Sequence, residues 1–291
     1  MKFTQFPRLN ISLNMNFPER STKRSSYWRV WLTFARNSLV REMSFRANFL
    51  ITLATRLLWF CSMMIFFKVV FLKTRQINGW GEYEYFAFIA TGMIINSIIE
   101  TFFMANCTNF SEQIRTGNLD FALLKPIDTQ FLISLEKMEW SVLSNLLFAG
   151  GLLFFSLHKL GISFGITEML VYLGFIGVGV SVFYSIMLVL TSASVWMGRN
   201  RGLHEFWFYV TVFSRYPRNI YRGSLGLPIY YLLSYCIPIL LVVSIPAESL
   251  ANRKIYDPRL AIVFICTSLM CLAISRWIFN YALKSYRSAS S

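Results

Sequence analysis

Long apolar stretches separated by short polar segments form the dominant pattern of this 291-residue chain. A helix needs about 20 apolar residues to cross roughly 30 Å of hydrocarbon, and six stretches approach or exceed that length. The pattern therefore predicts an all-α membrane protein with six transmembrane helices. Pro238 is expected to kink the fifth. The expected spans cover residues 49–72, 85–107, 142–156, 169–196, 229–245 and 260–283.

The two ends of the chain lack this pattern. Residues 1–26 are rich in Asn, Arg and Ser and contain no apolar core of a secretory signal, so we expect a disordered basic tail. Residues 27–286 are expected to form one transmembrane domain, and residues 287–291 a short C-terminal tail.

Lys and Arg are distributed unevenly over the loops. With six spans, both ends lie on one side, and that side carries 19 of these residues against six on the other. Cytosolic loops are enriched in positive charge, which predicts an orientation with both ends in the cytosol (N-in, C-in). The net charge of +14 accompanies 55% hydrophobic residues, which favours contact with a membrane surface and excludes nucleic acid as the expected partner.

An amphipathic helix is predicted immediately before the first span, over Tyr27–Met43. A basic helix that carries tryptophan favours the headgroup layer of a bilayer. The alternative is a simple cytosolic extension of the first span. Five residues define the two faces of this helix: Trp28, Arg29, Trp31, Phe34 and Arg36.

The segment between the second and third spans is too polar to cross a membrane and yet carries a compact apolar motif. Gly117 and Asn118 favour a turn, and Pro126 ends the element because proline disfavours a helical residue before it. The apolar residues Leu119, Phe121, Leu123 and Leu124 predict about two helical turns that press against another protein, with Arg115, Asp120 and Lys125 as a charged rim. The alternative is a connector whose leucines fold back onto the bundle.

A second cytosolic segment, residues 199–227, has two open interpretations. Its aromatic run, Glu205–Phe213, is too short to span a membrane. It can form an interfacial helix beneath the bundle, or the cytosolic beginning of a long, broken fifth span.

Four charged residues fall within or near the ends of the predicted spans. Arg56 and Glu100 each lie seven residues from the cytosolic end of their span, a depth of about 10 Å, which predicts an ion pair. That pair can serve as a gate on a substrate path or simply fix helix register. Lys68 and Arg276 lie near span ends and are expected to extend toward the headgroups.

Motifs for intrinsic catalysis are missing. The chain has no phosphate-binding loop of the G-x-x-x-x-G-K-[ST] type, and its two histidines, His158 and His204, are far apart. The five cysteines have no metal-ligand spacing. We therefore expect no catalytic, cofactor-binding or metal-binding residues and no enzyme activity in this chain.

The chain resembles the ABC-2 (type-2) permease subunits of bacterial ABC transporters. Three stretches carry the resemblance: Gly117–Pro126, Phe213–Pro217 with Ile220–Tyr221, and Ile237–Pro238 followed by Ile245–Leu250. The resemblance implies a permease of the bacterial inner membrane that exports its substrate as a dimer, with a second copy or a homologous permease. It carries over neither the substrate nor the choice between homodimer and heterodimer.

The same resemblance assigns roles to the cytosolic elements. Separate ABC ATPase subunits bind ATP and Mg²⁺, and the segment from Arg115 to Pro126 is the coupling helix that enters a cleft of the ATPase. The amphipathic helix at Tyr27–Met43 is the connecting helix. Ile245–Leu250 lies on the outer side of the membrane, near the mouth of the translocation path.

Two other functions compete with this one. A secondary transporter or channel that needs no ATPase is expected to carry several ionisable groups at mid-membrane and inverted repeats. The chain shows one such acid, Glu100, and no convincing repeat. The other alternative is a structural membrane protein without a translocation path.

Overall fold

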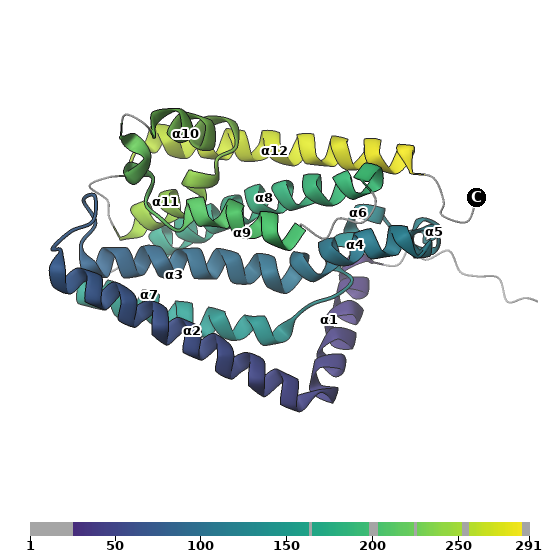
Figure 1. Cartoon of the computed structure of the whole chain (residues 1–291), viewed down its shortest axis with the longest axis horizontal. Helices are drawn as coiled ribbons and strands as arrows, with labels where there is room; N and C mark the ends of the chain where they lie inside the picture. Colours follow the sequence, from purple (N-terminus) through teal and green to yellow (C-terminus); the bar gives the residue numbers. More distant parts are fainter. Residues whose placement is uncertain (1–25, 163–164, 198–202, 224–225, 252–255, 287–291) are drawn as a thin grey trace, which may run out of the picture.

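The chain folds into a helical bundle in a computed structural model that describes residues 26–162, 165–197, 203–223, 226–251 and 256–286 (Figure 1). Within these residues there is no β-strand, and one isolated β-bridge closes the turn between Ile77 and Trp80. Residues 1–25 and 287–291 of the predicted tails lie outside the described residues.

Helices account for nearly all of the ordered structure in these ranges. The first half contains α1 (Tyr27–Ser44), α2 (Arg46–Lys73), α3 (Glu82–Ile99), the π-helical turn η1 (Glu100–Met104), α4 (Ala105–Arg115), α5 (Asn118–Leu123), α6 (Thr129–Leu135), the 3₁₀ turn η2 (Trp140–Leu143) and α7 (Ser144–Lys159). The second half contains α8 (Ile166–Met197), α9 (Leu203–Ser214), the 3₁₀ turn η3 (Arg218–Arg222), α10 (Leu227–Tyr231), the π-helical turn η4 (Leu232–Cys236), α11 (Ile239–Leu250) and α12 (Pro258–Ser285).

Five helical stretches of the described chain are long and apolar enough to cross a membrane, and a sixth candidate is a bent pair. This confirms an all-helical membrane protein with five to six candidate spans. The five stretches are Arg46–Lys73, Glu82–Arg115, Trp140–Lys159, Ile166–Met197 and Pro258–Ser285. Each is longer than its predicted span, because polar residues at the ends continue the helix beyond the apolar stretch.

The second candidate span runs without a break from α3 through η1 to α4. The π-helical turn starts at Glu100, and wider i→i+5 bonding leaves carbonyl groups free for other partners. The backbone N–H of Glu139 donates to the carbonyl of Thr101 at 3.0 Å. The turn therefore joins the middle of this long helix to the segment that precedes α7.

The prediction that residues 229–245 form one kinked helix is wrong, because this segment is divided into two helical stretches. The helical stretch Leu227–Cys236 and α11 meet at an angle of 79°. Pro238 lacks the N–H that would continue the helix, and Ile237 before it adopts extended backbone with φ −124° and ψ 93°. The proline thus produces a break instead of a bend.

α11 lies at the centre of the bundle, between α3, α8 and α9. All of its residues except Ser249 are buried. Gly179 of α8 allows the closest approach, because a Cβ there would lie 3.0 Å from the carbonyl oxygen of Val242. Ile245–Leu250 is therefore packed inside the bundle, and its expected position near the outer mouth of the path stays a prediction.

α8 and α12 lie side by side and run in the same direction (Figure 1). Near their first residues Phe175 packs on Tyr256, and near their last residues Trp196 packs on Tyr281, with ring centroids 6.4 and 6.0 Å apart. Because the helices are parallel, residues 198–257 must bring the chain back along the whole length of the bundle.

α9 forms the first part of this return. Trp207 is buried and packs edge-on against Phe183 of α8, with ring centroids 5.1 Å apart. Phe183 lies 14 residues before Met197, which is about 21 Å along the helix. α9 is therefore packed beside α8 and not beneath the bundle, which favours the broken fifth span over the interfacial helix.

Candidate functional site

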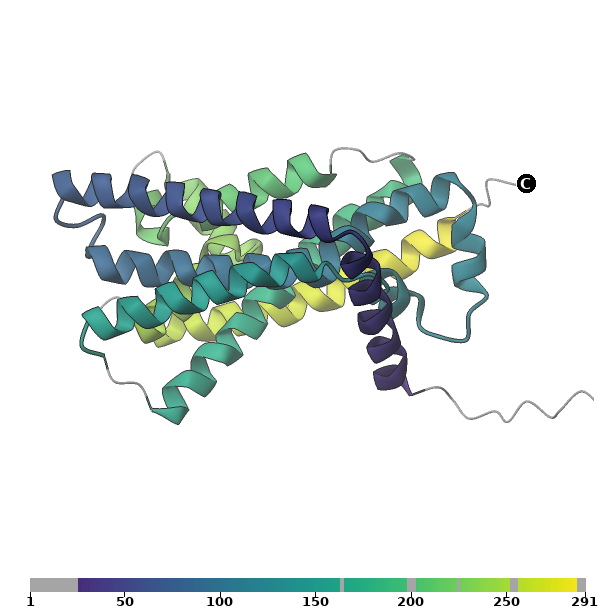
Figure 2. The ribbon, with the colours of Figure 1, turned by 90° about the horizontal axis from the view of Figure 1, so that it is seen from below.

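α1, α5 and α6 gather at the end of the bundle where α12 finishes, and α1 crosses the axes of the long helices (Figures 1 and 2). The predicted apolar motif and the amphipathic helix are thus neighbours. Their contacts with each other and with the long helices define the candidate site.

Gly117 sets the direction of α5. Its φ of 72° and ψ of 2° lie in the left-handed region, where glycine carries no steric penalty. The helix that follows is short, Asn118–Leu123, and a turn and a bend over residues 124–127, which include Pro126, separate it from α6. The turn and the stop therefore occur where the sequence predicts them.

The apolar residues of α5 divide into two groups. Leu119 is fully buried in a cluster with Phe110, Leu132, Leu188 and Phe279, so its expected role as an exposed contact is wrong. Leu119 instead fixes α5 to α4, α6, α8 and α12. On this one residue the alternative, a leucine folded back on the bundle, is correct.

The other group faces away from the bundle. Phe121 is 69% exposed, Leu123 39% and Leu124 81%. We call these three residues the α5 patch. Lys125 and Asn118 are exposed beside it, and Arg115 is exposed but forms an ion pair with Glu112 through its Nε at 2.9 Å and its Nη2. Of the predicted rim, Asp120 is half-buried.

α6 connects the α5 patch to the long helices through charge. The Asp128 side chain caps α6 by accepting a hydrogen bond from the N–H of Phe131 at 3.0 Å. It also binds Arg276 of α12 through both oxygens, at 3.1 and 2.5 Å. Hydrogen bonding from Arg276 holds the pKa of Asp128 below its usual value, although partial burial opposes this. Arg276 therefore does not simply extend toward the headgroups, as the sequence suggested.

A cavity of about 530 Å³, lined by both polar and apolar side chains, lies beside this ion pair, between α6, α8 and α12. The Tyr184 hydroxyl of α8 accepts a hydrogen bond from Gln130 at 2.7 Å and lies 2.8 Å from the hydroxyl of Ser134. Gln130 also accepts a hydrogen bond from Arg276 at 2.5 Å. One short helix is thereby joined to two of the candidate spans.

α1 docks on the segment between α6 and α7. Trp140 Nε1 donates to the carbonyl of Ala35 at 3.1 Å, the N–H of Met138 donates to the hydroxyl of Ser38 at 3.0 Å, and the N–H of Ser141 donates to Glu42 at 2.8 Å. The predicted helix is present, and it is anchored by more than its apolar face.

The five residues predicted to define the faces of α1 point in different directions. Phe34 packs against the cluster that holds Leu119. Trp28 is 63% exposed and stacks on Trp31 at 5.0 Å, and Arg29 and Arg36 are exposed. α1 thus shares the hydrophobic cluster of α5 with one side and presents aromatic and basic side chains with the other.

Arg56 and Glu100 are brought together as the depth calculation predicts. Arg56 Nη1 lies 3.1 Å from Glu100 Oε2, with the side chains 27% and 33% exposed. The pair joins α2 to the start of the π-helical turn η1. α2 has no fully buried residue, and this ion pair helps to hold it against the bundle, together with ring contacts such as that between Phe67 and Tyr85.

A second ion pair inside the bundle escaped the sequence analysis. Arg218 of η3 binds Glu248 of α11 through both ends of its guanidinium group, at 2.8 and 2.9 Å, and the side chains are only 2% and 0% exposed. The two residues are 30 positions apart, in segments assigned to opposite sides of the membrane. The available signal was weak: Glu248 directly follows the apolar residues Ile245–Ala247, which does not identify a partner 30 positions away.

Among the described residues no group of three His, Cys, Asp or Glu side chains is arranged to hold a metal ion. Residues 57–290 of the chain match the family model described as "ABC-2 family transporter protein". No curated protein and no solved structure matches the chain.

Proposed function

Because the chain belongs to the ABC-2 transporter family, it is a multi-pass membrane permease of an ABC transporter and not the catalytic component, and we propose that it exports its substrate as one half of a dimer. Family members generally work with an ABC ATPase subunit. We further propose that ATP and Mg²⁺ are bound by that subunit and that the α5 patch is its docking surface.

The observation that carries this proposal is the exposed α5 patch on a helix that is otherwise firmly held. Apolar side chains at a contact centre supply affinity, and charges at the rim supply register. Phe121, Leu123 and Leu124 suit the centre, and Lys125 suits the rim. An isolated patch of this kind on a rigid support marks an interaction surface.

The contacts behind the patch supply a route for transmitting motion. Leu119 fixes α5 to α8 and α12, and Asp128 joins α6 to α12. Trp140, in the segment between α6 and α7, joins that segment to α1. A displacement of α5 by ATPase closure therefore moves α6, α1 and two candidate spans together. In this proposal α1 is the connecting helix, and both ends of the chain lie in the cytosol of a bacterial inner membrane.

Replacing Phe121 and Leu124 together by Asp tests the docking surface. We expect the double variant to insert and fold but to lose the co-expressed ATPase subunit on affinity purification, because two carboxylates would be desolvated in an apolar cleft. The variant with Lys284→Asp and Ser285→Asp adds two carboxylates at the same end of the bundle, outside α5, and is expected to retain the ATPase. Full retention in the Phe121 and Leu124 variant would disprove the docking assignment.

A further inference from the structure

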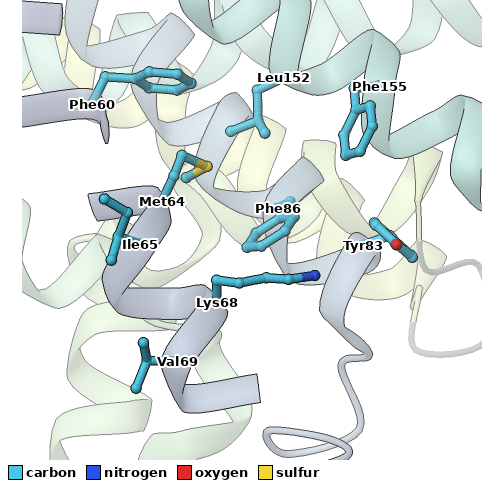
Figure 3. Close-up of a pocket in the computed structure, with 9 residues that line it drawn as sticks. All are labelled: Phe60, Met64, Ile65, Lys68, Val69, Tyr83, Phe86, Leu152 and Phe155. Atoms are coloured by element: carbon cyan, nitrogen blue, oxygen red, sulfur yellow. The ribbon is translucent and has the colours of Figure 1, made fainter. Parts of the chain in front are cut away.

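A second cavity, of about 500 Å³, lies between α2, α3 and α7 (Figure 3). Phe60 and Met64 of α2, Phe86 of α3 and Leu152 of α7 point toward it. Lys68 crosses one end with its ammonium group directed toward Tyr83. The cavity is thus apolar along its length and charged at one end. Its volume lies in the range of pockets that hold small organic ligands.

The position of the cavity along α2 matches one leaflet of a bilayer. Lys68 lies five residues before the end of α2 at Lys73, about 8 Å along the axis, and Phe60 lies 13 residues before it, about 20 Å. Half of the hydrocarbon core measures roughly 15 Å. The charged end therefore lies near headgroup depth, and the apolar part extends toward the middle of the membrane.

Lys68, the one charged residue among the described residues that line the cavity, has a partner of opposite sign directly beside the lining. Lys68 Nζ lies 2.6 Å from Glu82 Oε1, and the two side chains are 56% and 26% exposed. Glu82 is the first residue of α3, so the pair bridges two of the helices that form the cavity. An ammonium and a carboxylate held side by side offer partners to a headgroup that carries the complementary pair of charges.

We propose that this cavity binds one phospholipid whose headgroup contains a primary ammonium, as in phosphatidylethanolamine. Its phosphate accepts hydrogen bonds from Lys68, its ammonium donates to Glu82, and one acyl chain occupies the space between Phe60 and Leu152. A choline headgroup has no N–H to donate to Glu82. A glycerol headgroup brings no cation, so the lipid phosphate and the Glu82 carboxylate must share the single Lys68 ammonium.

Lipid competition on the purified chain tests the proposal. The chain is reconstituted in phosphatidylcholine nanodiscs that contain equal minor fractions of phosphatidylethanolamine and phosphatidylglycerol, and native mass spectrometry identifies the lipids that remain bound. Phosphatidylethanolamine is expected to be retained about tenfold over either competitor, because a hydrogen bond to a charged group contributes about 1.5 kcal/mol or more. Equal retention of the three lipids would overturn the proposal.

Two substitutions test the binding of the lipid headgroup and of its acyl chain separately. Glu82→Gln is expected to remove the preference for phosphatidylethanolamine and leave the total amount of bound lipid unchanged. Leu152→Trp fills the cavity and is expected to lower total retention, whereas Leu147→Trp on the same helix, at a position 78% exposed, is expected to have no effect. Equal lipid retention by the two Trp variants would refute the proposed site for the acyl chain. Should Leu152→Trp fail to fold, the Glu82→Gln variant still tests the proposal, because an unchanged lipid preference in that variant would also refute it.

Discussion

At the scale of single residues, the ion pairs of this permease differ mainly in burial. Arg115 and Glu112 meet on the surface of α4, where side-chain entropy and water offset most of the attraction. Arg218 and Glu248 meet where water cannot reach, so each charge depends on the other for its solvation. The cost of losing one partner should therefore differ sharply between the two pairs.

Glu248→Ala tests this difference. Removal of the carboxylate leaves the Arg218 guanidinium in the bundle interior, and breaking a buried pair in this way costs about 3–5 kcal/mol. We expect a marked decrease in the thermal unfolding temperature of the purified chain in detergent. Glu112→Ala, which breaks the exposed pair, is expected to leave that temperature unchanged. Similar unfolding temperatures for the two variants would show that the buried pair does not stabilise the fold.

At the scale of helices, the close contact between α8 and α11 depends on one glycine. A Cβ at Gly179 would meet the Val242 carbonyl at 3.0 Å and Ile95 at 3.2 Å, whereas a Cβ at Gly177 would meet nothing within 4 Å. Both positions are helical and lie two residues apart. They therefore form a matched pair for measuring how tightly α11 is held.

Gly179→Ala is expected to destabilise the bundle by about 1–3 kcal/mol, because the backbone of α11 cannot move away without disturbing its buried neighbours. Gly177→Ala is expected to be neutral or to stabilise by up to about 1 kcal/mol, through the higher helix propensity of alanine. Thermal unfolding of the two variants under identical detergent conditions measures the difference. An equal effect of both substitutions would mean that α11 is not rigidly packed against α8.

The helices could be predicted from the sequence where local information is sufficient. Apolar length alone locates α2, α7, α8 and α12, and counting residues from the span ends brings Arg56 to Glu100. Burial of Leu119 could not be predicted, because it requires Phe279, 160 positions later in the chain. The path of residues 198–257 could not be predicted either. It depends on Pro238 breaking the helix and on Arg218 neutralising Glu248, and neither outcome follows from local hydropathy.

At the scale of the whole molecule, the direction of the long helices constrains the topology. α8 and α12 are parallel, so α9, η3, α10, η4 and α11 together make one crossing although no one of them spans the bundle. Such a compound crossing is what the predicted even number of passes requires, since that number places both ends of the chain on one side. The buried α11 and the Arg218–Glu248 pair stabilise a segment that could not cross as a simple helix.

Cysteine labelling tests this compound crossing. In a background without the five native cysteines, Gln76→Cys and Arg259→Cys lie at one end of the bundle, and Thr116→Cys and Ser285→Cys lie at the other; all four positions are exposed. With both ends of the chain in the cytosol, a membrane-impermeant maleimide is expected to label the first two in intact cells and the last two only after permeabilisation. Labelling of Gln76→Cys without Arg259→Cys would place these two positions on opposite sides of the membrane. Residues 198–257 would then not cross, and the parallel packing of α8 and α12 could not persist in the membrane.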